Sequence, residues 1–265
     1  MLLLVPEARQ NTEQNMDDAL LNIIGQELRT PLMPIIHSAQ ILQRRGIEPE
    51  LVQATARIIE RQARLLGRLV EQLLDVSHAK LGAVHLKRER ISMADVVESA
   101  VQTMAAHISD RGQRLQVAIS ADSMELHADP TRLCQALQNL LVNSAKFSGQ
   151  GTFIRVRAAP DHGDAVVVVS DEGVGIDASH LESIFTLYTQ VGVRTTGRDG
   201  GLGIGLYLAR RFVEAHGGTL TATSPGVACG SSFTIRVPCL GFSPEAAAFP
   251  QWGPSSRSVS ALTTA

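Results

Sequence analysis

Two glycine-spaced segments in the second half of the chain constrain its fold most. The first reads Asp-Glu-Gly-Val-Gly-Ile at residues 171–176, and it follows residues 165–170, four valines between an alanine and a serine. Such an apolar run predicts a buried strand that delivers Asp171, a hydrogen-bond acceptor, at its end. Because Gly173 and Gly175 carry no Cβ, the backbone there can turn tightly and approach a flat ligand closely.

The second segment reads Gly-Gly-Leu-Gly-Ile-Gly-Leu at residues 200–206 and runs into an apolar-periodic stretch that ends at Gly217 and Gly218. Its glycines are therefore predicted to lie where a helix begins. Free backbone N–H groups and the positive end of the helix dipole gather at such a point, which favours phosphate binding. A glycine repeat alone is weak evidence, since turns and helix ends explain most of them.

A third element strengthens this interpretation. Within residues 133–147, Asn139, Asn143 and Lys146 recur at helical spacing, opposite an apolar face formed by Leu133, Leu137, Leu140 and Leu141. Two carboxamides one turn apart can offer oxygens to a hard cation, and the lysine can meet a phosphate. The three elements together predict a site for a nucleotide with Mg²⁺.

These residues resemble the ATP-site motifs of sensor histidine kinases. The matching motifs are Asn139-Leu-Leu-Val-Asn143-Ser-Ala-Lys146-Phe147, residues 171–176, Ile184-Phe185-Thr-Leu-Tyr188-Thr-Gln190 and Gly201-Leu-Gly203-Ile-Gly205-Leu206. Upstream, Glu27-Leu-Arg-Thr30-Pro31-Leu32 is similar to the phospho-acceptor motif of the same family. The resemblance covers roughly residues 16–240, and five ordered motifs are improbable by chance.

The resemblance implies roles for individual residues. Asn139 and Asn143 would hold Mg²⁺, Asp171 would accept the adenine amino group, and Lys146 would meet the phosphates of ATP. Residues 191–201 would form a mobile lid, with Arg194 and Arg198 as further phosphate contacts or as solvated loop residues. The rest of the ATP site would be Phe147, Gly173, Gly175, Ile176, Tyr188, Gly201, Leu202, Gly203, Gly205 and Leu206. Phe185 lies in a segment that shapes the lid in this family, and packing in the core is an equal explanation for this residue.

One position departs from the family. Gln26 stands where the family has its phosphorylated histidine, directly before Glu27. Helical periodicity places Gln26 on the solvent side, about 200° from Ile24 and Leu28. A carboxamide nitrogen is a very poor nucleophile, so self-phosphorylation at position 26 is predicted to be blocked. Glu27 and Thr30 of the motif are retained, and the exposed His37 is a weaker candidate acceptor without an adjacent base.

The first third of the chain predicts a helical hairpin. Apolar residues recur every three or four positions from residue 16 to about 45 and from 51 to 78, with a turn at 46–49. Pro31 and Pro34 are expected to bend the first helix just after Thr30. The hairpin cannot bury both apolar stripes alone, so a dimeric four-helix bundle is expected, as a homodimer or a heterodimer with a related kinase.

The remainder predicts an α/β sandwich, which makes the whole chain α+β. Strands are expected at 84–91, 115–120, 152–158, 165–170, 219–224 and 232–237, with helices at 93–109, 130–147 and 206–216. Ser92 and Asp129 are predicted N-caps. The expected domains are an N-terminal extension at 1–15, the hairpin at 16–80, the ATPase domain at 81–240 and a flexible tail at 241–265.

The composition of the chain indicates which kinds of binding partner are unfavourable. The chain has 265 residues, 44% of them hydrophobic, and a net charge of −2, which favours neither nucleic acid nor an anionic membrane. No apolar run approaches the ~20 residues of a membrane helix, so a cytoplasmic location without membrane contact is expected. The three scattered cysteines fit reduced thiols.

Three functional classes stay open at this point. The first is a histidine kinase core that uses Mg²⁺ and ATP and then passes phosphate to a response regulator receiver domain. The second is an ATPase of the wider fold shared with gyrase and the heat-shock chaperone, against which Asn139 argues because those proteins typically carry Glu there. The third is a phosphatase or scaffold module that docks a response regulator, with ATP as a conformational ligand.

Overall fold

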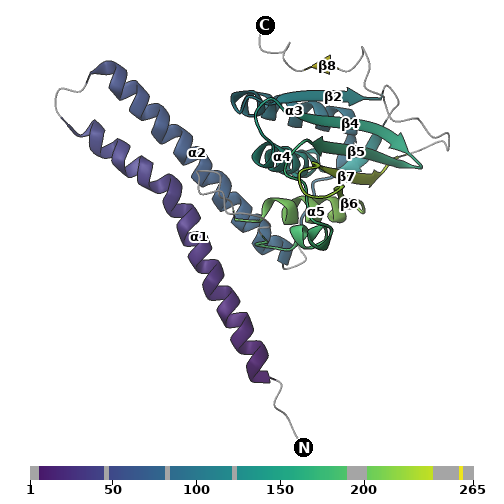
Figure 1. Cartoon of the computed structure of the whole chain (residues 1–265), viewed down its shortest axis with the longest axis horizontal. Coiled ribbons are helices and arrows are strands. Elements are labelled where there is room, and N and C mark those ends of the chain that lie inside the picture. The colour runs from purple at the N-terminus through teal and green to yellow at the C-terminus, as the bar shows by residue number, and fades with distance from the viewer. Residues whose placement is uncertain are drawn as a thin grey trace, which may run out of the picture. The chain divides into compact units, whose positions relative to one another are not determined.

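The computed structural model describes residues 6–44, 48–80, 84–120, 124–189, 202–240 and 257–258. These residues form two compact units, a helical one built mainly from the part of the chain before residue 78 and a larger α/β one (Figure 1). The predicted fold class, two long helices followed by an α/β domain with a mixed sheet, is confirmed. The predicted lid at 191–201 and most of the predicted tail lie outside the described residues.

The helical unit consists of α1, Pro6–Leu42, and α2, Pro49–Lys80, which turn back on each other (Figure 1). α1 begins at Pro6, inside the segment predicted to be an extension. It also stays helical through Pro31 and Pro34, and the bend expected just after Thr30 stays a prediction. Each proline nevertheless removes one backbone donor from the middle of α1.

The α/β unit contains a six-stranded sheet in the order β6-β7-β5-β4-β2-β8. The strands are β2 Arg114–Ile119, β4 Phe153–Asp161, β5 Asp164–Asp171, β6 Thr219–Thr223, β7 Ser231–Pro238 and β8 Arg257–Ser258. β2 and β4 are parallel, and the other neighbours are antiparallel. β4 and β5, both predicted as strands, form an antiparallel hairpin, and the register of β5 against β7 places Asp171 opposite Ser231.

Three helices, α3 Met93–Asp110, α4 Pro130–Phe147 and α5 Gly205–Ala215, pack against this sheet and against one another. The predicted N-caps are confirmed, because Ser92 accepts from Ala94 N and Asp129 accepts from Arg132 N. The predicted apolar face of α4 is also confirmed, since Leu133, Leu137, Leu140 and Leu141 are all buried. Burying this face fixes which side of α4 remains for polar side chains.

Two predictions about strands are wrong in detail. Only β1, Glu89–Ser92, is a strand within the predicted range 84–91, and it pairs with β3, Glu125–Ala128, which the sequence pattern did not predict. β8 was not predicted either. These strands are short, and each forms only because a distant segment supplies its partner.

None of the helices in the described part of the chain combines the length and the apolar character needed to cross a bilayer.

The N-terminus of α4 is tied to the end of α5 through a buried histidine. His216 accepts a hydrogen bond at Nε2 from the backbone N–H of Asp129, at 2.9 Å, and donates from Nδ1 to Phe212 O, at 2.7 Å. The Asp129 carboxylate in turn accepts from Lys87 N and Arg132 N. Burial lowers the pKa of His216 below its ordinary value, so the neutral tautomer that makes both bonds is favoured.

This arrangement predicts an acid-sensitive stability. As pH falls below about 6.5, the unfolded chain protonates His216 while the folded domain resists, so the free energy of unfolding decreases by up to ~1.4 kcal/mol per pH unit. We expect His216→Gln to remove this part of the slope between pH 7 and 5 in denaturant titrations. His107→Gln, at an exposed histidine of α3, is the matched control. An identical pH slope in wild type and His216→Gln would contradict the assignment.

Candidate functional site

Asp171 is the best-connected polar residue of the predicted site. It ends β5, is 8% exposed, and its carboxylate accepts four hydrogen bonds. Oδ1 accepts from Gly173 N at 2.9 Å and Ser231 N at 3.3 Å. Oδ2 accepts from Ser231 Oγ at 2.6 Å and Ser144 Oγ at 3.2 Å. The side chain predicted to be the base acceptor is therefore fixed by donors from α4, β7 and its own loop.

The first glycine segment is held by backbone on both sides. Val174 N donates to Phe147 O at the end of α4, and Gly230 N donates to Gly173 O. A Cβ at Gly173 would lie 2.5 Å from Phe147 O, and one at Gly175, whose φ is +69°, would lie 2.0 Å from Gly226 O. The protein's own backbone thus already requires glycine at both positions, a reason that differs from the predicted approach of a ligand. Ile176, next along, is half-buried and donates its N–H to Ser224 Oγ.

The second glycine segment lies beside α4. Gly203 has a φ of +66° and its carbonyl accepts from Tyr188 N, while Gly205 is the first residue of α5. A Cβ at Gly205 would lie 3.6 Å from the Asn139 side chain, so the segment directly faces this amide. Leu202 is buried and Leu206 half-buried, whereas Gly201 lies outside the described residues.

The predicted polar edge of α4 is present. Asn139, Asn143 and Lys146 are each half-buried, and Phe147, the last residue of α4, is 36% exposed. The ammonium of Lys146 lies 5.0 Å from the Phe147 ring centroid, a cation–π contact. Within the described part of the chain, neither asparagine carboxamide has a hydrogen-bond partner, so both oxygens are available as ligands.

The start of the third matching motif, at Ile184 and Phe185, packs inward. Ile184 and Phe185 are buried, and the Arg210 guanidinium lies 5.1 Å above the Phe185 ring. Core packing therefore explains Phe185. Tyr188 is half-buried with a φ of +64°, a strained value for a residue with a side chain.

The acceptor-like position on α1 is exposed, as predicted. Gln26, Thr30 and His37 are exposed, and Glu27 is half-buried. The Thr30 hydroxyl donates to the backbone carbonyl of Gln26 at 3.0 Å, one turn earlier. The spacing of four residues places the two side chains on the same face of α1.

Sequence reasoning missed Ser144 and Ser231 of the site. Both are buried against Asp171. A signal existed for each: Ser144 is a polar residue on the apolar face of α4, and Ser231 occupies an inward position in the alternation of β7. Ser224, which accepts from Ile176 N and donates to Gly230 O, was missed as well.

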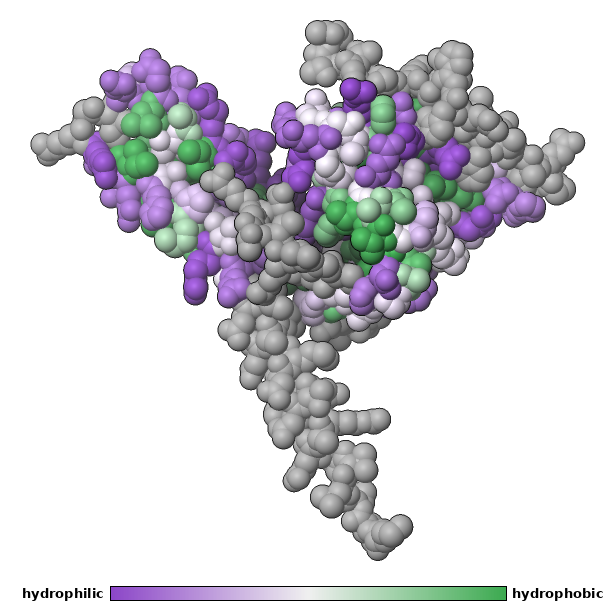
Figure 2. All heavy atoms as spheres, viewed as in Figure 1, coloured by the Kyte–Doolittle hydropathy of each residue, from purple (hydrophilic) through white to green (hydrophobic). Residues whose placement is uncertain are grey.

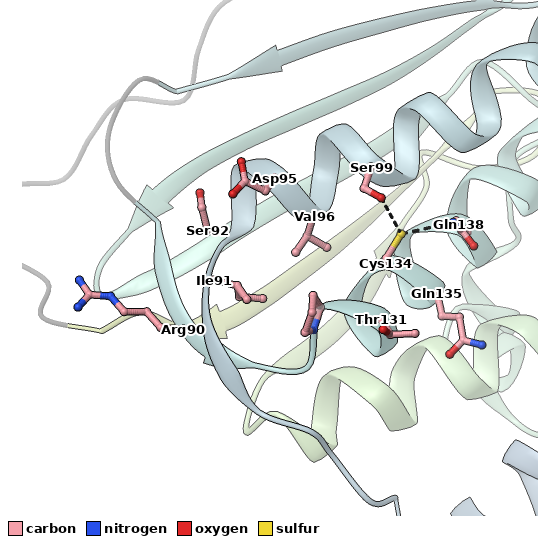
Figure 3. A pocket seen from close by; sticks show the side chains of 11 residues that line it. Arg90, Ile91, Ser92, Asp95, Val96, Ser99, Thr131, Cys134, Gln135 and Gln138 are labelled. Carbon is pink, nitrogen blue, oxygen red and sulfur yellow. Dashed lines mark hydrogen bonds between the residues drawn. The ribbon is translucent and has the colours of Figure 1, made fainter.

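A separate hollow of about 450 Å³ lies beside β1 and the first turns of α3 and α4 (Figure 3). The Cys134 thiol contacts Ser99 and Gln138 there. Burial raises the pKa of this thiol, which keeps it protonated and weakly nucleophilic at neutral pH. The predicted nucleotide residues do not line this hollow, whose walls are Arg90, Ile91, Ser92, Asp95, Val96, Ser99, Pro130, Thr131, Cys134, Gln135 and Gln138.

Comparison with known families agrees with this fold. Residues 128–240 match the family described as histidine kinase-, DNA gyrase B- and HSP90-like ATPase, which is a class of ATP-binding domains. Residues 16–82 match the His Kinase A phospho-acceptor domain. The two domains in this order make the chain a sensor histidine kinase core.

Individual relatives extend over most of the chain. The sensor protein TorS of Escherichia coli K12 is 34% identical over 240 residues, which cover 88% of this chain and 25% of TorS. The probable sensor histidine kinase TcrY of Mycobacterium tuberculosis is 30% identical over 219 residues, covering 82% of this chain and 45% of TcrY. The chain therefore spans a quarter to under half of these relatives.

A solved structure supports the fold. The histidine kinase AdeS of Acinetobacter baumannii superposes with a TM-score of 0.59 at 22% sequence identity, over 81% of this chain and 98% of that one. At this identity the likeness concerns the fold alone.

The glycine contacts predict a sharp contrast between two substitutions. Gly175→Ala places a methyl group against Gly226 O and forces an alanine to a positive φ, so we expect a loss of about 2 kcal/mol or more in unfolding free energy. Gly149→Ala meets nothing within 4 Å and should change stability by less than ~0.5 kcal/mol. Thermal and denaturant unfolding of both variants measures this contrast, and equal stabilities would show that the 175 loop relaxes freely.

Proposed function

We propose that this chain is the catalytic core of a two-component histidine kinase. It binds Mg·ATP along α4 and directs phosphoryl transfer toward a histidine and then toward the aspartate of a response regulator receiver domain. The arrangement of α4 carries this proposal: Asn139 faces Gly205 near one end of the site, and Phe147 contacts the Gly173 loop at the other. Eight residues of helix separate these ends by roughly 12 Å, a span suited to a nucleotide.

The adenine base of ATP would bind at the end of the site where Asp171 lies. Its buried carboxylate is held by donors behind it, and an ionised carboxylate only accepts hydrogen bonds. It is thus matched to the amino group of adenine. Phe147, whose backbone carbonyl contacts this loop, is partly exposed and offers an aromatic surface at this end of α4.

The phosphates would bind at the Gly205 end. α3 and α4 each have a side-chain N-cap, but α5 has none, so its first N–H groups remain available to an anion. Asn139 and Asn143 supply neutral oxygens of the kind that bind Mg²⁺ when a triphosphate provides the negative charge. Gly205 keeps the backbone close to Asn139, and Lys146, the residue before Phe147, adds positive charge along the same edge of α4.

The residue at position 26 determines whether the chain can phosphorylate itself. Gln26 is exposed where a kinase domain and a partner can both reach it, yet its amide nitrogen cannot act as a nucleophile. We therefore propose that this chain does not phosphorylate itself at position 26. A heterodimer with a related kinase would supply the missing histidine.

A second function is favoured by the contact between Thr30 and Gln26. The Thr30 hydroxyl directs its proton to the Gln26 carbonyl, which leaves the oxygen lone pairs of Thr30 able to accept from water. The exposed Gln26 amide can both donate and accept. Together they can orient water toward a docked phospho-aspartate, so the chain would act as a phosphatase or as a dock for a response regulator.

Dimerisation through the hairpin is part of the proposal. Several large apolar side chains of α1 and α2 are exposed in the single chain, and Figure 2 shows apolar surface among polar surface near the loop end of the hairpin. A second copy would bury them at about 25 cal/mol per Å². They are Leu32, Met33, Ile36, Leu51, Val52, Ile58, Val70 and Leu74. Because ATP and receiver domains are cytoplasmic reactants, we place this activity in the cytoplasm.

Titration with a fluorescent ATP analogue in Mg²⁺ tests the first proposal. We expect Asp171→Ala to weaken binding by roughly tenfold or more, because the amine loses a charged acceptor. Asp177→Ala removes an exposed carboxylate six positions on and serves as the matched control, with unchanged affinity expected. Equal affinities in wild type and Asp171→Ala would remove the basis of the proposed site.

Labelling with γ-phosphate tests position 26. We expect Gln26→His to label itself from Mg·ATP while wild type does not, because the imidazole restores the nucleophile. An unlabelled Gln26→His protein would place the defect elsewhere in the chain.

The phosphatase alternative is measured in the decay of a phosphorylated receiver domain. Decay that is faster with wild type than with Thr30→Ala or Gln26→Ala supports it. The same receiver lifetime with all three proteins excludes it.

A further inference from the structure

Ser144 is a hydroxyl buried behind the Asp171 carboxylate. Its exposed fraction is 0%, and it lies on the face of α4 that otherwise buries leucines and alanines. Its Oγ donates to Asp171 Oδ2 at 3.2 Å. A nucleotide cannot touch a side chain with no exposed surface, so any effect of Ser144 on binding must pass through Asp171.

The hydrogen bonds to Asp171 leave little capacity for another donor. An ionised carboxylate has about four lone-pair positions, and Gly173 N, Ser231 N, Ser231 Oγ and Ser144 Oγ meet four. A fifth donor, such as the adenine amine, therefore has to replace one of these bonds or share its lone pair. Two of the four donors are backbone N–H groups, which cannot turn away.

Of the two hydroxyls that donate to Asp171, that of Ser144 can give up its hydrogen bond more easily. The Ser231 bond is short, at 2.6 Å, and the same residue also donates its N–H to the other oxygen. The Ser144 bond is longer, at 3.2 Å, and a serine within a helix can turn its proton to the carbonyl one turn earlier, here that of Leu140. Ser144 thus keeps a partner in either position.

We infer that Ser144 is an exchangeable donor that determines how strongly this chain prefers adenine nucleotides. In nucleotide-free protein its hydroxyl satisfies Asp171, and when ATP binds the adenine amine takes its place. The inference rests on the proposed nucleotide site and adds a residue that acts through Asp171. The hydrogen bond from Ser144 to Asp171 then stabilises the nucleotide-free domain. The same bond weakens ATP binding, because it has to break when the adenine amine binds.

Inosine triphosphate separates this effect from general damage to the site. It carries an oxygen where ATP carries the amine, so it cannot replace the Ser144 hydroxyl at Asp171. We expect Ser144→Ala to bind ATP about fivefold more tightly and inosine triphosphate with unchanged affinity. The same variant should unfold at a lower temperature than wild type without nucleotide, and gain more thermal stability from ATP.

Ser148→Ala is the matched control. Ser148 is also buried at the end of α4, but its hydroxyl has no hydrogen-bond partner among the described residues. The Ser148→Ala substitution should leave the ratio of ATP affinity to inosine triphosphate affinity unchanged. If this ratio in Ser144→Ala equals or falls below the wild-type ratio, the inference is overturned while the nucleotide site stays in place. Failure of wild type to bind ATP overturns the proposed site itself.

Discussion

The buried carboxylate of Asp171 is the interaction on which the α/β unit's polar architecture depends. Its four donors come from α4, from the loop after β5 and from the start of β7, segments that the chain contributes far apart. Hydrogen bonds to a charged group are worth about 1.5–3 kcal/mol each, and leaving a buried charge without them costs more. The register of β5 against β7 and the close approach of α4 to the sheet are therefore fixed at the same point.

α4 joins this point to the rest of the domain because both of its ends are fixed. Asp129 caps its first turn and is bound by His216, while Gln113 Nε2 donates to Ala145 O and Ser148 O at its last turn. One face belongs to the apolar core, and the opposite edge carries Asn139, Asn143 and Lys146. A helix held in this way keeps the side chains of its polar edge in a fixed position relative to the glycine loops, as a preorganised binding site requires.

The parts of the fold that were predictable from the sequence are those with local causes. Ser92 and Asp129 cap helices through their own nearest residues, and the four leucines of α4 follow a helical period. β1, β3 and β8 depend on partners far along the chain, so no local pattern of residues 89–92 or 125–128 defines them. The candidate site divides similarly. The motif residues are predicted from their spacing, but the reason for Gly173 and the contacts of Ser144 and Ser231 with Asp171 depend on residues far along the chain.

The two prolines of α1 have a consequence for the surface around Gln26. A proline has no N–H to give to the carbonyl four residues earlier, so Pro31 and Pro34 leave the carbonyls of Glu27 and Thr30 without their helical donors. Two carbonyl oxygens that lack the N–H donor four residues later thus lie within about one turn of Gln26. Water would hydrate the backbone there, and an approaching protein can donate hydrogen bonds to main-chain positions that depend on the two prolines and on no other side chain.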